Sequence, residues 1–167
     1  TYLYEREPGS GKAGKATKLF TNRPALEGQP LVKMNPVVIK SRDGLDLVSY
    51  LSLPLWADAD QDGKAEKAAP LVLMVHGGPW ARDDWGFDPY HQWLANRGYA
   101  VLSVNFRGST GFGKQFVNAG NMEWAGKMHD DLLDAVEWAV KSGAAEKNKV
   151  AIMGGSYGGY ATLVGLT

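Results

Sequence analysis

Hydrophobic positions along the chain follow two different periods. Residues 37–40 are a short β-branched run, and residues 45–53 alternate apolar and polar positions after a turn at Arg42-Asp43-Gly44, which predicts a β-hairpin. Three continuous apolar runs are typical of strands buried on both faces of a parallel sheet: residues 71–75, 100–104 and 150–153.

Segments with apolar residues at helical spacing lie between and after these runs. The clearest helix is predicted over residues 126–141, with aspartates in its first half and Lys141 at its end, which suits the helix dipole. Shorter helices are predicted at 90–96 and from Tyr157 onward. A hairpin followed by β-α-β-α-β-α predicts an α/β fold with a mostly parallel sheet.

The first 35 residues have a different character. A short strand at 2–5, a turn at 8–11 and a polar stretch at 12–18 precede a segment punctuated by Pro24, Pro30 and Pro36. This part resembles the end of another structure followed by a linker. We therefore expect two parts, residues 1–35 and 36–167.

The amino-acid composition excludes several classes of protein. The 167 residues hold 18 basic and 18 acidic side chains, so no basic field favours nucleic acid. The absence of cysteine excludes a disulfide scaffold and a thiol nucleophile. No apolar run is long enough to predict a membrane span. We expect no cofactor and no nucleic-acid or membrane partner.

The segment Gly154-Gly155-Ser156-Tyr157-Gly158 matches the G-x-S-x-G pattern of a nucleophile elbow. The elbow requires a strand, a strained turn and a helix, and the predicted elements supply that order. The alternative is a glycine-rich strand–helix turn that holds an incidental serine. The flanking elements favour Ser156 as a catalytic nucleophile.

A second glycine-rich turn, His76-Gly77-Gly78-Pro79, follows the predicted strand at 71–75. In α/β-hydrolases this loop supplies one oxyanion donor, and the residue after the nucleophile supplies the other. We predict the backbone N–H groups of Gly78 and Tyr157 as the donors. His76 precedes the nucleophile in the chain, so we expect it to shape the loop by hydrogen bonding.

Three segments together carry a family resemblance: residues 76–80 (HGGPW), 105–113 (NFRGSTGFG) and 154–160 (GGSYGGY). Residues 36–167 resemble the prolyl oligopeptidase family of serine peptidases, in its acylaminoacyl-peptidase and dipeptidyl-aminopeptidase branch. The resemblance implies the N-terminal half of an α/β-hydrolase domain, preceded by a short remnant of a β-propeller. It also implies peptide substrates, an acyl-enzyme on Ser156, oxyanion donors at Tyr157 and Gly78, and a pocket loop in which Arg107 either orders the loop or faces the site.

The catalytic acid and histidine that the resemblance implies would follow Ser156, yet residues 157–167 contain no Asp, Glu or His. The chain also lacks an initiator Met and stops within a predicted helix. We therefore expect a peptidase fragment, truncated after the elbow and inactive alone. Compartment, cytoplasmic or periplasmic, and oligomeric state stay open.

Three other hypotheses remain. A carboxylesterase would share the elbow and the oxyanion loop, and a binding module could use the same fold without catalysis. The segment Asp58-x-Asp60-x-Asp62 resembles the start of a calcium loop, but Ala69 stands where a bidentate glutamate is needed. We favour a solvated acidic loop there and predict no metal. We expect His91 and His129 to be surface or packing residues.

Overall fold

The computed structural model describes residues 1–6, 9 and 13–167 and divides the chain into two units, Thr1–Leu31 and Val32–Thr167. In the first unit, β1 (Tyr2–Glu5) and β2 (Lys15–Lys18) form a two-stranded antiparallel sheet. A 3-10 turn follows at Pro24–Leu26. Of the predicted turn at 8–11, only Gly9 is among the described residues. The propeller remnant stays a prediction.

The second unit is built on a five-stranded sheet with the order β3-β4-β6-β5-β7. The strands are β3 (Met34–Lys40), β4 (Asp46–Ser52), β5 (Ala69–Val75), β6 (Ala100–Val104) and β7 (Ala145–Gly154). β3, β4 and β6 pair antiparallel, whereas β6, β5 and β7 run parallel. The predicted α/β architecture with its hairpin is confirmed.

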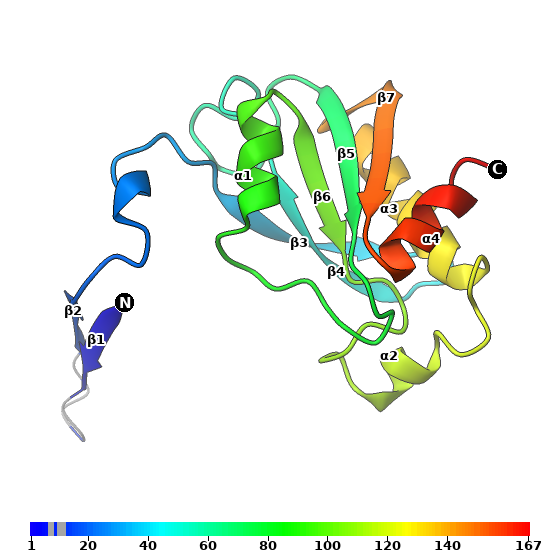
Figure 1. The fold of residues 1–167 in the computed structure, drawn as a ribbon, viewed down its shortest axis with the longest axis horizontal. Helices are drawn as coiled ribbons and strands as arrows, with labels where there is room; N and C mark the ends of the chain where they lie inside the picture. The colour runs from blue at the N-terminus through cyan, green and yellow to red at the C-terminus, as the bar shows by residue number, and fades with distance from the viewer. Residues whose placement is uncertain (7–8, 10–12) are drawn as a thin grey trace. The chain divides into compact units, whose positions relative to one another are not determined.

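Helices cover both faces of this sheet (Figure 1). They are α1 (Pro89–Asn96), α2 (Lys114–Asn118), α3 (Lys127–Lys141) and α4 (Tyr157–Val164). The main core lies on the side of α3 and α4, where Leu132 and Ala161 pack with the strands. A smaller cluster under α1 contains Val72, Leu94 and Val101. Among the described residues, no helix has the length and apolar character of a membrane span.

One expectation about an individual element is wrong. Residues 150–153 were predicted to be a strand buried on both faces, but β7 is longer and Val150 is 39% exposed. β7 pairs only with β5 within the described chain, so it forms the edge of the sheet. Within the polar stretch 12–18, for which the sequence predicts no element, Lys15–Lys18 form β2 and pair with β1. The two compact units meet between residues 31 and 32, four residues before the predicted division after residue 35, and the assignment of the two parts as domains stays a prediction.

Candidate active site

The turn between β7 and α4 has the geometry of a nucleophile elbow. Ser156 lies at φ 55° and ψ −120°, in a region of backbone conformation that non-glycine residues rarely adopt. A residue is held there only when the surrounding structure enforces it, at a cost of about 1–3 kcal/mol. An incidental surface serine would have no such requirement. The Ser156 residue is exposed, so an incoming group can reach it.

Two glycines let the strand and helix approach each other closely enough to force this conformation. A Cβ atom on Gly154 would lie 2.4 Å from the carbonyl oxygen of Val75, and one on Gly158 would lie 2.0 Å from the same atom. Gly155, in contrast, has open space around it. The first and last glycines of the G-x-S-x-G pattern are therefore required by contact with β5, whereas the intervening one is not.

The loop after β5 lies directly against this turn. A Cβ atom on Gly77 would be 3.2 Å from the Cβ of Ser156, so the backbone at Gly77 lies next to the serine. Gly78 has a positive φ of 119° and is exposed. Within the described residues, the N–H groups of Gly78 and Tyr157 donate to no other protein group. Both amides are free for a ligand, and their role as oxyanion donors stays a prediction.

His76 joins this loop to the one that follows β6. Its Nδ1 is 2.7 Å from the carbonyl oxygen of Gly77, and its Nε2 is 2.9 Å from Oγ of Ser109. The imidazole also stacks on Phe106 at a centroid distance of 4.5 Å. Burial lowers the pKa of His76, although its backbone contact with Gly77 acts in the opposite direction. Its expected role of shaping the loop by hydrogen bonding is confirmed.

Aromatic rings surround Tyr157, the residue after the nucleophile. Its ring is buried and contacts Phe106, Trp124 and Tyr160 at centroid distances of 5.3, 5.0 and 5.8 Å. Burial raises the pKa of the Tyr157 hydroxyl to about 12, so the side chain stays neutral. The ring therefore anchors the first turn of α4, which carries the Tyr157 amide.

Arg107 lies in a buried ion cluster. Its Nε and Nη2 donate to Asp131 of α3 at 2.9 and 2.7 Å, and its Nη1 and Nη2 donate to Asp43 at 2.9 and 2.8 Å. Its backbone N–H also donates to Asp131. The hydrogen bonds to Asp131 and Asp43 hold the pKa of Arg107 above its ordinary value. These contacts favour the first of the two predicted roles, ordering the loop.

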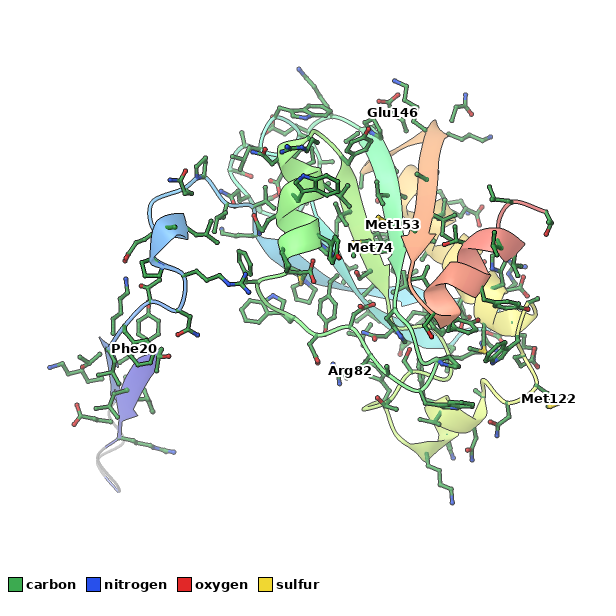
Figure 2. The ribbon with its side chains drawn as sticks, in the orientation of Figure 1. Phe20, Met74, Arg82, Met122, Glu146 and Met153 are labelled. Atoms are coloured by element: carbon green, nitrogen blue, oxygen red, sulfur yellow. The ribbon has the colours of Figure 1, made fainter. Side chains whose placement is uncertain are left out.

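A hollow of about 390 Å³ opens beside the elbow, on the side of the sheet that faces α1. Met74 and Met153, paired across β5 and β7, line it together with Gly77 and Gly155 (Figure 2). Tyr90 of α1 closes one side. The hollow is thus a continuation of the surface next to the serine.

Among the described residues, neither of the other two histidines is hydrogen-bonded to Ser156. His91 is buried on α1, and its ring nitrogens bond to Ser52 and Ser103, each at 2.9 Å. Burial lowers the pKa of His91 to about 4. His129 of α3 is half-buried, and its Nδ1 has no hydrogen-bond partner among the described residues. The packing role expected for His91 is confirmed, with two hydrogen bonds that its sequence position did not reveal.

The acidic loop before β5 brings one oxygen each of Asp58, Asp60 and Asp62 within 4.8 Å of one another. The carboxylate of Asp58 accepts hydrogen bonds from the backbone N–H groups of Asp62 and Gly63. These bonds give the aspartates a structural use in the turn. The prediction that the loop holds no metal stays a prediction.

Comparison with known proteins supports the motif-based resemblance. The model of the prolyl oligopeptidase family matches residues 85–167. Dipeptidyl aminopeptidase BIII of Pseudoxanthomonas mexicana is 69% identical over 99% of the chain, and dipeptidyl peptidase family member 6 of Caenorhabditis elegans is 48% identical over 99%. The chain covers 23% and 24% of these two relatives, so it spans about a quarter of their length.

Solved structures give the same result. An acylaminoacyl peptidase in complex with Z-Gly-Gly-Phe-chloromethyl ketone superposes with a TM-score of 0.75 at 26% identity, over 92% of this chain and 24% of the other. A puromycin-hydrolyzing peptidase of Mycobacterium tuberculosis gives 0.71 at 28% identity, over 80% and 20%. The family match, the two relatives and these folds agree with the three motifs. This chain therefore belongs to the prolyl oligopeptidase family.

Proposed function

We propose that this chain supplies the nucleophile and the oxyanion donors of a serine peptidase that hydrolyses short peptides. The observation that carries the proposal is the backbone of Ser156, held at φ 55° by glycines that contact β5. Family membership supports peptide chemistry, and the relatives include a dipeptidyl aminopeptidase. In this proposal residues 36–167 form the first half of an α/β-hydrolase domain.

The reaction follows from the chemistry of an activated serine. Oγ of Ser156 attacks the peptide carbonyl carbon and gives its proton to a general base, and the carbonyl oxygen becomes an oxyanion. The N–H groups of Tyr157 and Gly78 donate to that oxyanion. Collapse of the intermediate breaks the C–N bond, the amine leaves with a proton, and water then hydrolyses the acyl-enzyme.

The base and its orienting acid come from outside these 167 residues in this proposal. The hydrogen bonds of His76 and His91 go to other groups, and residues 157–167 have no acid or histidine. The chain expressed alone is therefore expected to show no peptidase turnover. Robust hydrolysis of an acylated aminoacyl amide by the isolated chain would contradict this part of the proposal.

The decisive experiment uses the longer polypeptide that carries this chain together with the remaining catalytic groups. We expect a fluorophosphonate to label Ser156 and Ser156→Ala to lower kcat at least about a thousandfold. Ser142→Ala, at an exposed serine after α3, serves as the matched control and keeps full activity. Absence of labelling would favour the binding module instead.

A carboxylesterase remains the second candidate, because it would use the same elbow and the same amides. Rates on an amide and an ester with identical acyl groups separate the two. A peptidase is expected to hydrolyse both substrates, whereas an esterase would hydrolyse the ester and leave the amide intact.

A further inference from the structure

The hydrogen bonds of His76 define the state of its imidazole. A carbonyl oxygen can only accept, so Nδ1, 2.7 Å from the Gly77 oxygen, carries a proton. In a neutral imidazole Nε2 is then the acceptor, and Oγ of Ser109 donates to it. Burial lowers the pKa of His76, which favours this neutral form near pH 7. The ring is thus fixed from both sides, by Gly77 and by Ser109.

The contact with the Gly77 carbonyl has a consequence for the next residue. The carbonyl of Gly77 and the N–H of Gly78 belong to one planar trans peptide unit, in which they point in opposite directions. Fixing one therefore fixes the direction of the other. The same peptide lies beside the nucleophile, because Gly77 lies next to Ser156. The imidazole consequently determines where the Gly78 N–H points relative to Ser156.

Ser109 is itself held rigidly. It is fully buried, and its backbone N–H donates to the carbonyl of Phe106 at 3.0 Å. The next residue, Thr110, donates its N–H to the carbonyl of Ala81 at 2.9 Å, which ties this loop to the far end of the oxyanion loop. Two positions before Ser109, the Arg107 cluster anchors the loop to α3. Ser109 is therefore a fixed point against which the imidazole can be aligned.

We propose that Ser109 is a positioning residue: through His76 it sets the plane of the Gly77–Gly78 peptide and so aims the Gly78 N–H at the oxyanion. This inference rests on the proposed function, since it assigns an oxyanion role to Gly78. Ser109 touches neither substrate nor the reacting atoms. Its effect is confined to the transition state, because the aimed donor interacts with charge that develops only there.

The kinetic consequence is a selective loss of kcat. Removing an oxyanion donor outright lowers kcat by about 10²–10³-fold, and misalignment should cost less. For Ser109→Ala we expect kcat to fall about 10- to 100-fold while KM changes less than about threefold. Ser109→Thr keeps the hydroxyl and should restore most of kcat. Affinity for a peptide boronic acid, which mimics the tetrahedral state, should fall in parallel with kcat/KM.

The chain offers a matched control. Oγ of Ser103 is likewise hydrogen-bonded to Nε2 of a buried histidine, His91, at 2.9 Å, but this pair lies on the α1 side and, among the described residues, makes no hydrogen bond to the loop at 76–79. Ser103→Ala removes the same kind of hydrogen bond and should leave kcat within about twofold of the parent. His76→Phe keeps an aromatic ring on Phe106 but loses both hydrogen bonds. It should lower kcat at least as far as Ser109→Ala.

The measurements are made in the longer polypeptide, with Ser156→Ala as reference. Hydrolysis that does not depend on Ser156 would overturn the proposed function itself. Ser156-dependent hydrolysis in which Ser109→Ala matches Ser103→Ala in kcat and in boronate affinity would overturn only the positioning role. If Ser109→Ala does not fold, His76→Phe decides: unchanged kcat rejects the inference, and a selective fall in kcat supports it.

Discussion

Two loops leave the carboxyl ends of the neighbouring parallel strands β5 and β6, and they differ in how their polar groups are satisfied. In the loop after β6, Asn105, Arg107 and Ser109 are all buried and all hydrogen-bonded. In the loop after β5, Trp80 and Trp85 are exposed. Oδ2 of Asp83 in that loop is buried without a hydrogen-bond partner among the described residues.

The difference fits the proposed peptidase, in which the loop after β6 supports the loop after β5. The paired side chains of Asn105, Arg107 and Ser109 hold the loop after β6 in place, since each would lose its partner if the loop moved. The loop after β5 keeps the amide of Gly78 free for a ligand, and it also holds the buried, unpaired Oδ2 of Asp83, which costs stability. In the proposed peptidase, the chemistry lies on the less satisfied loop and is aligned by the satisfied one.

The largest effect on stability is expected for Arg107→Met, which tests the supporting role of the loop after β6. It leaves Asp131 buried without its cation, and we expect the free energy of unfolding to fall by about 3–5 kcal/mol. Arg42→Met is the matched control, because Arg42 also bonds α3 aspartates but is 54% exposed; it should cost less than about 1 kcal/mol. Denaturant unfolding measures both. Equal losses of unfolding free energy in the two variants would contradict a structural role for the Arg107 cluster.

The second test addresses the unpaired carboxylate. Burial, with smaller contributions from Asp88 and Asp84, raises the pKa of Asp83 to about 7. The folded state therefore binds a proton that the unfolded state releases near pH 4, so stability falls as pH rises from about 4 to about 7. Asp83→Asn lacks this titration. Its stability advantage over the parent should grow across that window and reach about 2–4 kcal/mol above pH 7.

The buried His91 titrates in an overlapping window but with the opposite sign. Its lowered pKa removes stability as pH falls from about 6.5 to 4, in the parent and in Asp83→Asn alike. The difference between the two proteins therefore isolates Asp83. A difference that stays constant from pH 4 to 8 would show that Asp83 is not destabilised by its burial.

The third test breaks the connection between the loops. Oδ1 of Asn105 accepts from the backbone N–H of Asp83 at 2.8 Å, and Nδ2 donates to the Asp83 carbonyl at 3.2 Å. Asn105→Ala leaves both backbone groups without this partner, so we expect a loss of about 1–3 kcal/mol in thermal or denaturant unfolding. Hydrogen exchange of the Asp83 amide should accelerate in the variant. Unchanged exchange would argue that the amide is protected by other means.

The smallest effect is expected at the exposed end of the loop after β5. Trp85 is 67% exposed, and its indole N–H donates to the Met34 carbonyl at 2.8 Å. Trp85→Phe removes one exposed hydrogen bond and should change the free energy of unfolding by less than about 1 kcal/mol. A loss of stability as large as that of Asn105→Ala would show that this end of the loop also supports the fold.

The sequence predicted those features that depend on local pattern. Alternation and apolar runs located the hairpin and the three parallel strands, and the G-x-S-x-G segment located the strained serine. The pairing of Arg107 with Asp131 and Asp43 could not be predicted, because it joins residues that only the folded sheet and α3 bring together. The length and exposure of β7 were missed for the same reason, since strand position in a sheet is a tertiary property.

The contact of Gly154 and Gly158 with the carbonyl of Val75 also bears on the order of folding. Val75 and the two glycines are far apart in the chain, and β5 and β7 come together as a parallel pair across an intervening crossover. The unusual backbone of Ser156 can therefore form only after this long-range, slowly formed pairing is complete. Until then the serine is an ordinary flexible residue. In the proposed peptidase, a nascent chain therefore acquires its shaped nucleophile only after β5 and β7 have paired.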